Sequence, residues 1–349
     1  MKAGYELELL CPPGLTRLSV AQAIASKFKL ALVPCFHRES ELWPGADNAT
    51  PYYCLTKGFE LFEKNQWQFR VVNDMTVKDS IDLAVTESPE WFHVLTDDIR
   101  FIDLIRRHCN AGEPCASILS PIARLFNSEV KLSDGIYSVT GLDSKLVCGA
   151  HSKATDRNRI CEIVTAPITE NHHEKLSEIL QIATSMGCVV PKEGAFHIHF
   201  DGEPHANSSG LLRVIRYFYV WSDVLKALIP PNPHCTRLGE YSAEIVDYSF
   251  NRDNALKDFA RVKSDLKALS PTKYCDFNFT NILIGNLNKF TIEVRVIPML
   301  LDSAALSAAS DLYSSFMNFI STSNVGYKKQ KLKANAKNIK NLFKALNDS

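Results

Sequence analysis

The chain has 349 residues, of which 46% are hydrophobic and 22% charged, and its formal net charge is zero. This composition is that of a globular protein with one large domain or two smaller ones. The neutral balance argues against binding to nucleic acid or to an anionic membrane through overall charge. No apolar run approaches the ~20 residues that span a bilayer.

The predicted segments of the first half of the chain are a strand over 4–9, an amphipathic helix over 16–30, a long loop over 37–58, a strand over 67–77 with Asp74 near its end, and helices over 97–110 and 116–127. The helices follow from apolar residues at helical spacing, and the strands from alternation. The loop follows from its content of Pro, Gly, Asn and Asp, and loops of that length are often functional.

The predicted segments of the second half are a strand over 161–167, a helix over 170–186 ended by Gly187, a strand over 196–201, an apolar helix from Asn207 or Ser208 to about Leu228, a polar helix over 252–269, a strand over 291–298 and a buried helix over 303–319. Pro230 and Pro231 are expected to stop the apolar helix. Strands and helices are mixed without a regular β-α-β alternation, which favours the α+β class, with an antiparallel sheet and helices on one face.

The C-terminal segment 327–349 differs in composition from the rest of the chain, with seven lysines and one aspartate. Apolar residues recur in it at helical spacing, which predicts an amphipathic helix. A lysine-covered outer face over a docked apolar stripe is the favoured interpretation, and a binding site for acidic partners is the alternative.

The ten cysteines include no Cys-x-x-Cys pair and lie mostly within apolar stretches. This pattern favours reduced core cysteines over a disulfide or zinc framework. A strand-like segment begins almost at the N-terminus, without the charged start and apolar stretch of a secretory signal. We therefore expect a cytoplasmic protein.

Charged and imidazole side chains recur on strand-like segments that are far apart in the sequence. They are Glu6, Glu8, Glu162, His197, His199, Glu293 and Arg295. Within each segment they alternate with apolar residues, and the i, i+2 spacing places both members of a pair on one face of a strand. If these faces meet, four carboxylates converge, which implies a bound divalent cation. Oxygen-rich ligation with one imidazole suits Mg²⁺ or Mn²⁺.

Each of these motifs also has a simpler interpretation when it is taken alone. Glu6 and Glu8 could form the solvated face of an ordinary strand, and Glu293 with Arg295 could be a cross-strand salt bridge. The pair His197 and His199 favours ligation. Neither a Gly-rich phosphate loop nor a Gly-x-Ser-x-Gly elbow occurs, so a bound nucleotide would have to be held by metals and arginines.

A family resemblance rests on six motifs that occur in order along the chain. They are Gly4-Tyr-Glu-Leu-Glu8, Val71-Val-Asn-Asp-Met-Thr76, Glu162-Ile-Val-Thr-Ala-Pro-Ile168, Gly194-Ala-Phe-His-Ile-His199, Lys273-Tyr-Cys-Asp-Phe-Asn278 and Thr291-Ile-Glu-Val-Arg295. Over residues 4–322 the chain resembles the amidoligase family, relatives of glutamine synthetase and glutamate-cysteine ligase in the carboxylate-amine ligase superfamily. Three features depart from the family pattern: Met75 in place of glycine, Gly-Ala-Phe before the histidine pair, and an apparent insertion over 80–150.

The resemblance implies a glutamine synthetase-like catalytic domain over 1–323, with a curved antiparallel sheet, followed by the lysine-rich helix over 324–349. It implies an ATP-dependent ligase that joins a carboxylate to an amine through an acyl phosphate, with Mg²⁺ or Mn²⁺ as cofactor. The implied roles are a first metal at Glu6, His197 and Glu293; a second at Glu8, Glu162 and Asp74; catalytic contacts from Arg295, Arg237 and His199; and substrate contacts from Asn278 and Tyr241. The substrates would be small molecules or peptides, with no nucleic acid or membrane partner, and a homo-oligomer stays open.

Three alternatives stay open at this point. A cupin-like metal oxygenase would use His197, His199 and Glu203, because histidines with one carboxylate suit Fe²⁺. A phosphotransferase on the same fold would stop at a phosphorylated product. A metabolite-binding or scaffold protein would keep the fold without catalysis.

Overall fold

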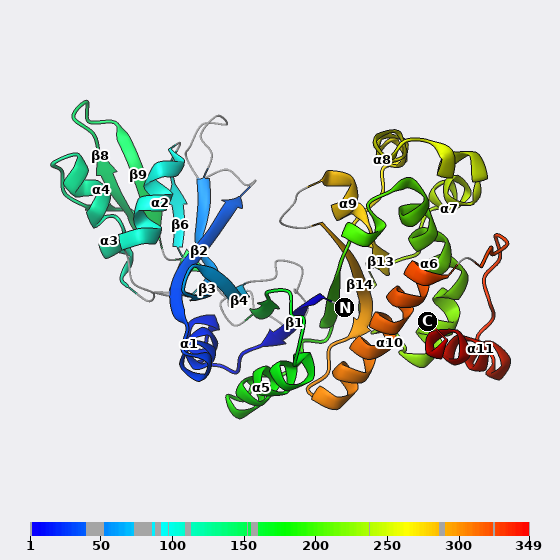
Figure 1. Ribbon diagram of the computed structural model, residues 1–349. Coiled ribbons are helices and arrows are strands. Elements are labelled where there is room, and N and C mark those ends of the chain that lie inside the picture. Colours follow the sequence, from blue (N-terminus) through cyan, green and yellow to red (C-terminus); the bar gives the residue numbers. More distant parts are fainter. Residues whose placement is uncertain are drawn as a thin grey trace. The chain divides into compact units, whose positions relative to one another are not determined.

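The computed structural model (Figure 1) describes residues 2–39, 52–72, 86–87, 92–96, 98–108, 113–151, 153–154, 160–236, 238–285, 290–323 and 325–348. The chain forms two compact units. The first comprises Met1–Leu7, Pro167–Leu180 and Lys192–Ser349, and the second comprises Glu8–Ala166 and Gln181–Pro191. The described pairings in both units are antiparallel, so the fold is of the α+β class, as predicted.

The sheet of the first unit has the strand order β13, β14, β12, β1. Their bounds are β1 (Ala3–Leu10), β12 (Ala195–Asp201), β13 (Phe277–Asn278) and β14 (Thr291–Pro298). The predicted strands at 4–9, 196–201 and 291–298 are confirmed. Along β12 the side chains of Phe196, Ile198 and Phe200 are fully buried, so one face of this sheet is apolar and the alternate positions are left for polar residues.

Helices pack on the apolar face of this sheet. Figure 1 shows α6 (Ser208–Leu228) beside α10 (Ser303–Thr322). The ring of Phe218 on α6 stacks on Phe277 of β13 at 4.2 Å between centroids, and Phe277 also contacts Tyr313 of α10. The predicted start of α6 is confirmed, because the side chain of Asn207 accepts a hydrogen bond from the N–H of Gly210 at 2.7 Å.

The remaining helical segments of this unit are α5 (His172–Ser185), η2 (Glu203–His205), α7 (Ala243–Phe250), η3 (Arg252–Leu256), α8 (Phe259–Ala268), α9 (Thr280–Ile284) and α11 (Ala336–Asn347). The single polar helix predicted over 252–269 is wrong, because a 3-10 turn ends at Leu256 and α8 starts afresh. Asp258 causes the break: it has extended backbone and caps α8 by accepting from the N–H of Arg261 at 2.8 Å.

The C-terminal segment packs on the first unit. The N–H of Leu332 donates to the carbonyl of Val220 at 2.8 Å, and Leu342 of α11 is fully buried. α11 is shorter than the helix expected over 327–349, because Asn335 caps it and accepts from the N–H of Asn338.

The second unit is also built on an antiparallel sheet, in the order β11, β4, β3, β6, β9, β8, β7, with β2 paired to β3. The strand bounds are β2 (Ala31–Glu39), β3 (Tyr52–Glu63), β4 (Gln66–Val72), β5 (Thr86–Glu87), β6 (Phe92–Leu95), β7 (Lys131–Ser133), β8 (Ile136–Thr140), β9 (Leu146–His151), β10 (Lys153–Ala154) and β11 (Ile160–Thr165). Its helices are α1 (Arg17–Phe28), α2 (Ile99–His108), α3 (Cys115–Ile118) and α4 (Ser120–Leu125). The helices predicted over 16–30 and 97–110 and the strand at 161–167 are confirmed. The strand predicted over 67–77 is confirmed as far as Val72, and 73–77 lie outside the described residues. The single helix predicted over 116–127 is wrong, because α3 ends at Ile118 and α4 begins at Ser120.

The loop predicted over 37–58 is wrong at both of its ends. β2 continues to Glu39 and β3 begins at Tyr52, and the two strands pair as far as Glu39 with Tyr52. The aromatic and β-branched residues of the sequence Tyr52-Tyr-Cys-Leu-Thr favour a strand, and this local preference outweighs the turn-forming composition of the segment as a whole. The centre of the predicted loop, 40–51, lies outside the described residues.

The segment predicted as an insertion, 80–150, contains its own hydrophobic cluster. Its buried members are Val94, Ile102, Ile105, Cys115, Ile118, Leu119, Ile122, Ala123, Val139, Cys148 and Ala150. The cysteines whose side chains the structure describes are unbridged, and all of these but Cys235 are buried, as predicted. None of the helices in the described ranges is long and apolar enough to cross a membrane.

Candidate functional site

A ladder of polar residues crosses four adjacent strands of the first unit. Glu6 of β1 lies opposite His197 of β12. His199, two residues further along β12, lies opposite Glu293 of β14, which in turn lies opposite Asn278 of β13. Residues directly opposite in an antiparallel pair share a face of the sheet and lie within reach of each other. These five residues and Arg295 are called the polar cluster below.

Two histidines and two carboxylates of the polar cluster form a continuous chain of contacts. Nδ1 of His197 lies 2.9 Å from Oε2 of Glu6, and Nε2 of His199 lies 3.0 Å from Oε1 of the same carboxylate. Nδ1 of His199 lies 3.3 Å from Oε1 of Glu293. His199 therefore stands between Glu6 and Glu293 and contacts both.

Glu293 is the most heavily engaged carboxylate of the polar cluster. Asn278 donates from Nδ2 to Oε2 of Glu293 at 2.9 Å, and Nη1 of Arg295 lies 3.1 Å from the same oxygen. Asn281 at the start of α9 donates to the other oxygen. Asn278 is itself oriented by Thr280, whose N–H and hydroxyl both donate to its Oδ1. The Glu293 carboxylate is thus held in one orientation by neutral and cationic donors.

A β-bulge lies beside the polar cluster. The register between β12 and β14 shifts at His197, so this one residue opposes both Arg295 and Val296. Bulges bend a strand and change the direction of nearby side chains, and they are frequent next to active sites. The bulge therefore sets where the Arg295 guanidinium lies relative to the two histidines.

The contacts of the polar cluster displace the pKa values of its members. Burial would raise the pKa of the Glu6 carboxyl, but the positive charge of His199 and hydrogen bonds from both histidines hold it well below its usual value. Burial also opposes ionisation of Glu293, yet its pKa is lowered, chiefly by His199. The two carboxylates therefore remain ionised in a largely buried place.

The pKa values of the two histidines of the polar cluster are shifted in opposite directions. Burial lowers the pKa of His197, and the neighbouring Arg295 adds to this, so His197 is neutral at pH 7. Burial acts in the same direction on His199, but the charges of Glu6 and Glu293 outweigh it and raise the pKa of His199. In its protonated form His199 is the counter-ion of both carboxylates.

The donor types of Glu6, His197 and Glu293 fit a hard divalent cation, since two carboxylates and a neutral imidazole are available. In the structure, however, Glu6 contacts His197, and His199 lies between Glu6 and Glu293. Among the described residues these three do not form a group whose ligand atoms all lie within 4.8 Å of one another. A cation at this place would have to replace His199 between Glu6 and Glu293.

The other predicted site residues are not gathered into the polar cluster by the described contacts. Glu8 and Glu162 belong to the second unit, where Glu8 is buried on β1 and Glu162 is half-buried on β11. Asp74 and Arg237 lie outside the described residues. The second metal expected at Glu8, Glu162 and Asp74, and the catalytic contact expected from Arg237, stay predictions.

A pocket of about 300 Å³ opens beside the polar cluster, and Arg295 lines it. It is called the Arg295 pocket, and its lining residues are Lys226, Pro231, Asn232, Cys235, Leu238, Gly239, Glu240, Asp276, Arg295, Val296 and Ile297. Nζ of Lys226 lies 2.7 Å from Oδ2 of Asp276 and 3.3 Å from Oε1 of Glu240. The volume is at the lower end of the range for small-molecule sites, and the walls offer groups of both charges.

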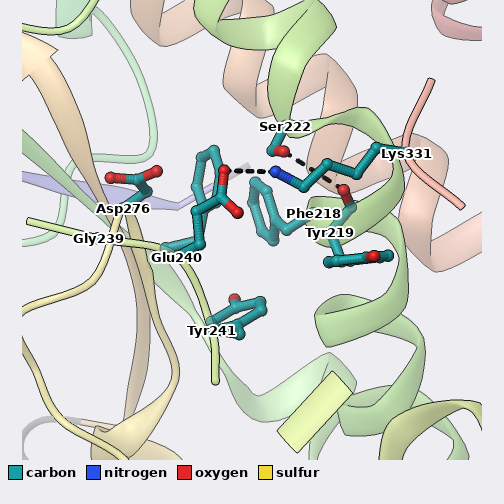
Figure 2. Close-up of a pocket in the computed structure, with 9 residues that line it drawn as sticks. Phe218, Tyr219, Ser222, Gly239, Glu240, Tyr241, Asp276 and Lys331 are labelled. Atoms are coloured by element: carbon teal, nitrogen blue, oxygen red, sulfur yellow. Dashed lines mark hydrogen bonds and ion pairs between the residues drawn. The ribbon is translucent and has the colours of Figure 1, made fainter. Parts of the chain in front are cut away.

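A narrower pocket next to it contains Tyr241 (Figure 2). Figure 2 shows the Tyr241 ring below Glu240, and the carboxylate of Glu240 accepting a hydrogen bond from Lys331 of the C-terminal segment. Burial raises the pKa of the Tyr241 hydroxyl well above its usual value, so the hydroxyl is neutral. Tyr241 thus lies in this pocket, and Asn278 lies in the polar cluster. Their predicted contacts with substrate stay predictions.

Four residues of this region were missed in the sequence: Lys226, Glu240, Asp276 and Asn281. Asp276 had a usable signal, because it stands at i, i+2 from Asn278 within a motif that had been recognised. Lys226 and Glu240 had none, since a lysine near the end of an apolar helix and a glutamate in a loop are common surface residues.

The cupin-like alternative fails on the geometry. The antiparallel strands of the described residues do not form a closed barrel. His197 and His199 contact Glu6 and Glu293, whereas Glu203 is exposed on the 3-10 turn that follows β12. The three residues that this alternative needs are therefore not gathered.

A family model described as a putative amidoligase enzyme matches residues 1–317 of the chain. The searches of curated proteins and of solved structures each find no match. The matched range includes every residue of the polar cluster and of the Arg295 pocket.

Proposed function

Because the chain belongs to the amidoligase family, we propose that it is an ATP-dependent ligase that joins a carboxylate to an amine through an acyl phosphate. The proposal extends to a glutamine synthetase-like fold for the catalytic domain and to Mg²⁺ or Mn²⁺ as the cofactor. The observation that supports it most directly is the position of Arg295, which contacts Glu293 of the polar cluster and also lines the Arg295 pocket.

The proposed cofactor site consists of Glu6, His197 and Glu293. When bound there, the cation would neutralise charge on the phosphate oxygens of ATP. The neutral imidazole of His197 and the ionised carboxylates are already in the protonation states that ligation needs. His199 would give up its place between the carboxylates together with its proton, so it is the residue whose protonation competes with cation binding.

The proposed chemistry has two steps. An oxygen of the substrate carboxylate attacks the γ-phosphorus of ATP, which forms an acyl phosphate and releases ADP. The ammonium form of the amine loses one proton to solvent, its nitrogen then attacks the acyl carbon, phosphate leaves, and the nitrogen loses a second proton. Arg295 would stabilise the charge of the transferred phosphoryl group and position the acyl phosphate for the amine, because a guanidinium offers two parallel donors to phosphate oxygens.

The two substrates would differ in where they meet the site. The Arg295 pocket is the proposed place of the reacting carboxylate, because Arg295 and Lys226 provide positive charge there. Asp276 and Glu240, on the same wall, provide negative charge that would attract the ammonium form of the amine. Glu293 is already held by Asn278 and Asn281, so the site does not have to reorganise that carboxylate during the reaction.

The test begins with calorimetric titration of the metal-stripped chain with a nonhydrolysable ATP analogue, with and without Mg²⁺. Glu6→Gln and Glu293→Gln variants are compared with the wild type. We expect Mg²⁺-dependent binding that both variants lose. Absence of binding by the wild type with any divalent cation would overturn the proposal.

Product analysis then separates the ligase from a phosphotransferase on the same fold. Candidate carboxylates and amines are incubated with ATP and Mg²⁺, and products are identified by mass. The ligase gives ADP, inorganic phosphate and an amide in equal amounts. A stable phosphorylated product without an amide would favour the phosphotransferase instead.

A further inference from the structure

A second group of possible metal ligands lies apart from the polar cluster, in the first unit. His172 and His173 are the first two residues of α5, and Asp311 is on α10. Nε2 of His173 lies 2.9 Å from Oδ1 of Asp311, and Nε2 of His172 lies 3.5 Å from the same oxygen. One ligand atom from each residue lies within 4.8 Å of the other two, and no other group of three in the described residues meets that condition.

The backbone around this group favours the convergence. Asn171, directly before α5, has a φ of +57°, a left-handed conformation that asparagine tolerates better than most residues. The two imidazoles meet edge to face, with ring centroids 4.6 Å apart. Ser310, next to Asp311, is fully buried and shares a 2.8 Å hydrogen bond with the hydroxyl of Tyr5 on β1. The helix that presents Asp311 is therefore tied to the sheet at that turn.

A simple helix-to-helix hydrogen bond would need only one histidine. Here two imidazole nitrogens approach one carboxylate oxygen, so three possible ligand atoms from two helices lie close together. Four ligands at about 2.0–2.1 Å in a tetrahedral site lie about 3.4 Å from one another. The distances from Oδ1 of Asp311 to Nε2 of His173 and of His172, 2.9 and 3.5 Å, are close to that value.

We propose that His172, His173 and Asp311 bind one transition-metal ion of the Zn²⁺ class. Two imidazoles and one carboxylate form a borderline donor set that suits Zn²⁺, whereas Mg²⁺ prefers oxygen ligands in an octahedron. His173 and Asp311 are 54% and 53% exposed, so the ion reaches the site from solvent and its fourth position is left for water. The site joins α5 to α10 and is independent of the proposed ligase function.

The experiment is a calorimetric titration of the metal-stripped full chain with Zn²⁺, without nucleotide. We compare the wild type with His173→Ala and Asp311→Asn, and we use His234→Ala, an exposed histidine elsewhere in the same unit, as the control. We expect one Zn²⁺ site in the wild type and in the control, and a loss of affinity of about tenfold or more in the other two variants. Co²⁺ in place of Zn²⁺ is expected to give the visible absorption of a tetrahedral site in the wild type and in the control, and not in His173→Ala or Asp311→Asn.

The polar cluster also contains histidines, so the assignment needs a second comparison. The variants Glu6→Gln and Glu293→Gln are titrated with Zn²⁺ in the same way, and we expect the site to persist in both. Loss of the site in these variants, or unchanged affinity in His173→Ala and Asp311→Asn, would overturn the proposal. Since Asp311→Asn keeps the size of an exposed side chain, its circular dichroism spectrum and thermal unfolding midpoint in the absence of metal are expected to match the wild type.

Discussion

Nδ1 of His197 lies 2.9 Å from Oε2 of Glu6, on the neighbouring antiparallel strand. The two residues are 191 positions apart in the sequence. This contact begins a chain that continues through His199 to Glu293 and from there to Arg295. The arrangement places ionised carboxylates, a neutral imidazole and a guanidinium on one face of four adjacent strands. The predictions below test what these groups and their surroundings do.

Arg295→Lys is expected to lower turnover by about 10³-fold while leaving the affinity for an ATP analogue within a few fold. Lysine keeps the positive charge but lacks the planar fork that meets two phosphate oxygens at once. The measurement is kcat for ADP release beside calorimetric analogue binding. Arg261→Lys, on the exposed side of α8, is the matched control, and near wild-type kcat in Arg295→Lys would remove Arg295 from the mechanism.

Asp276→Asn is expected to lower the free energy of unfolding by about 1–3 kcal/mol. Asp276 is buried and its carboxylate lies 2.7 Å from Nζ of Lys226, so the variant weakens a charged hydrogen bond of a largely buried pair. Urea unfolding of the wild type and the variant measures the change. Asp143→Asn, at an exposed pair with Lys145, is the control and is expected to behave like the wild type. Equal stability of all three proteins would show that the pair with Lys226 contributes nothing.

Leu342→Ala is expected to lower the free energy of unfolding of the region around α11 by about 2–5 kcal/mol. Leu342 is fully buried, whereas the next residue, Phe343, is 47% exposed. Hydrogen exchange of the α11 amides measures the change locally, with Phe343→Ala as the control on the same helix. If both variants increase exchange equally, the apolar stripe of α11 is not what holds the C-terminal segment.

Stability is expected to fall as the pH is lowered from about 6.5 to about 4, in part because of His205. Burial lowers the pKa of this histidine to about 4, with a further contribution from Arg213 and an opposing one from Asp201. The unfolded chain has an ordinary pKa of about 6.5 at this residue. Between these two pH values His205 is protonated in the unfolded chain and neutral in the folded protein, so lowering the pH favours unfolding. The loss from this residue is on the order of 3 kcal/mol.

Urea unfolding of the wild type and of His205→Gln at a series of pH values checks this expectation. The variant should show a shallower fall across the window, whatever its stability at neutral pH, because glutamine does not titrate. His234→Gln, an exposed histidine, should keep the wild-type slope. Parallel curves for His205→Gln and the wild type would contradict the prediction.

The predictable part of the candidate site came from alternation within single strands. The i, i+2 spacing of His197 with His199, and of Glu293 with Arg295, correctly placed these side chains on the polar face of their strands, because a strand turns successive side chains to opposite sides. Capping preferences likewise placed the start of α6 at Asn207 or Ser208, and the structure shows Asn207 as the cap. Composition over a long window was less reliable: it assigned 52–58 to a loop, although the strand preference of those residues decides their structure.

The sequence by itself determined which residues have polar side chains on strands, where most of the longer helices form, and, through ordered motifs, the family. Only the tertiary structure decided that Glu6 meets His197 and that Glu293 meets His199. It also decided that a bulge places Arg295 opposite His197, and that Lys226 and Asp276 line a pocket with Arg295. The physical reason is that a strand pattern is periodic and compatible with several registers, whereas the observed register follows from packing of the whole apolar face against α6 and α10. Contacts such as those of His172 and His173 with Asp311 depend on the same packing, and no local pattern contains them.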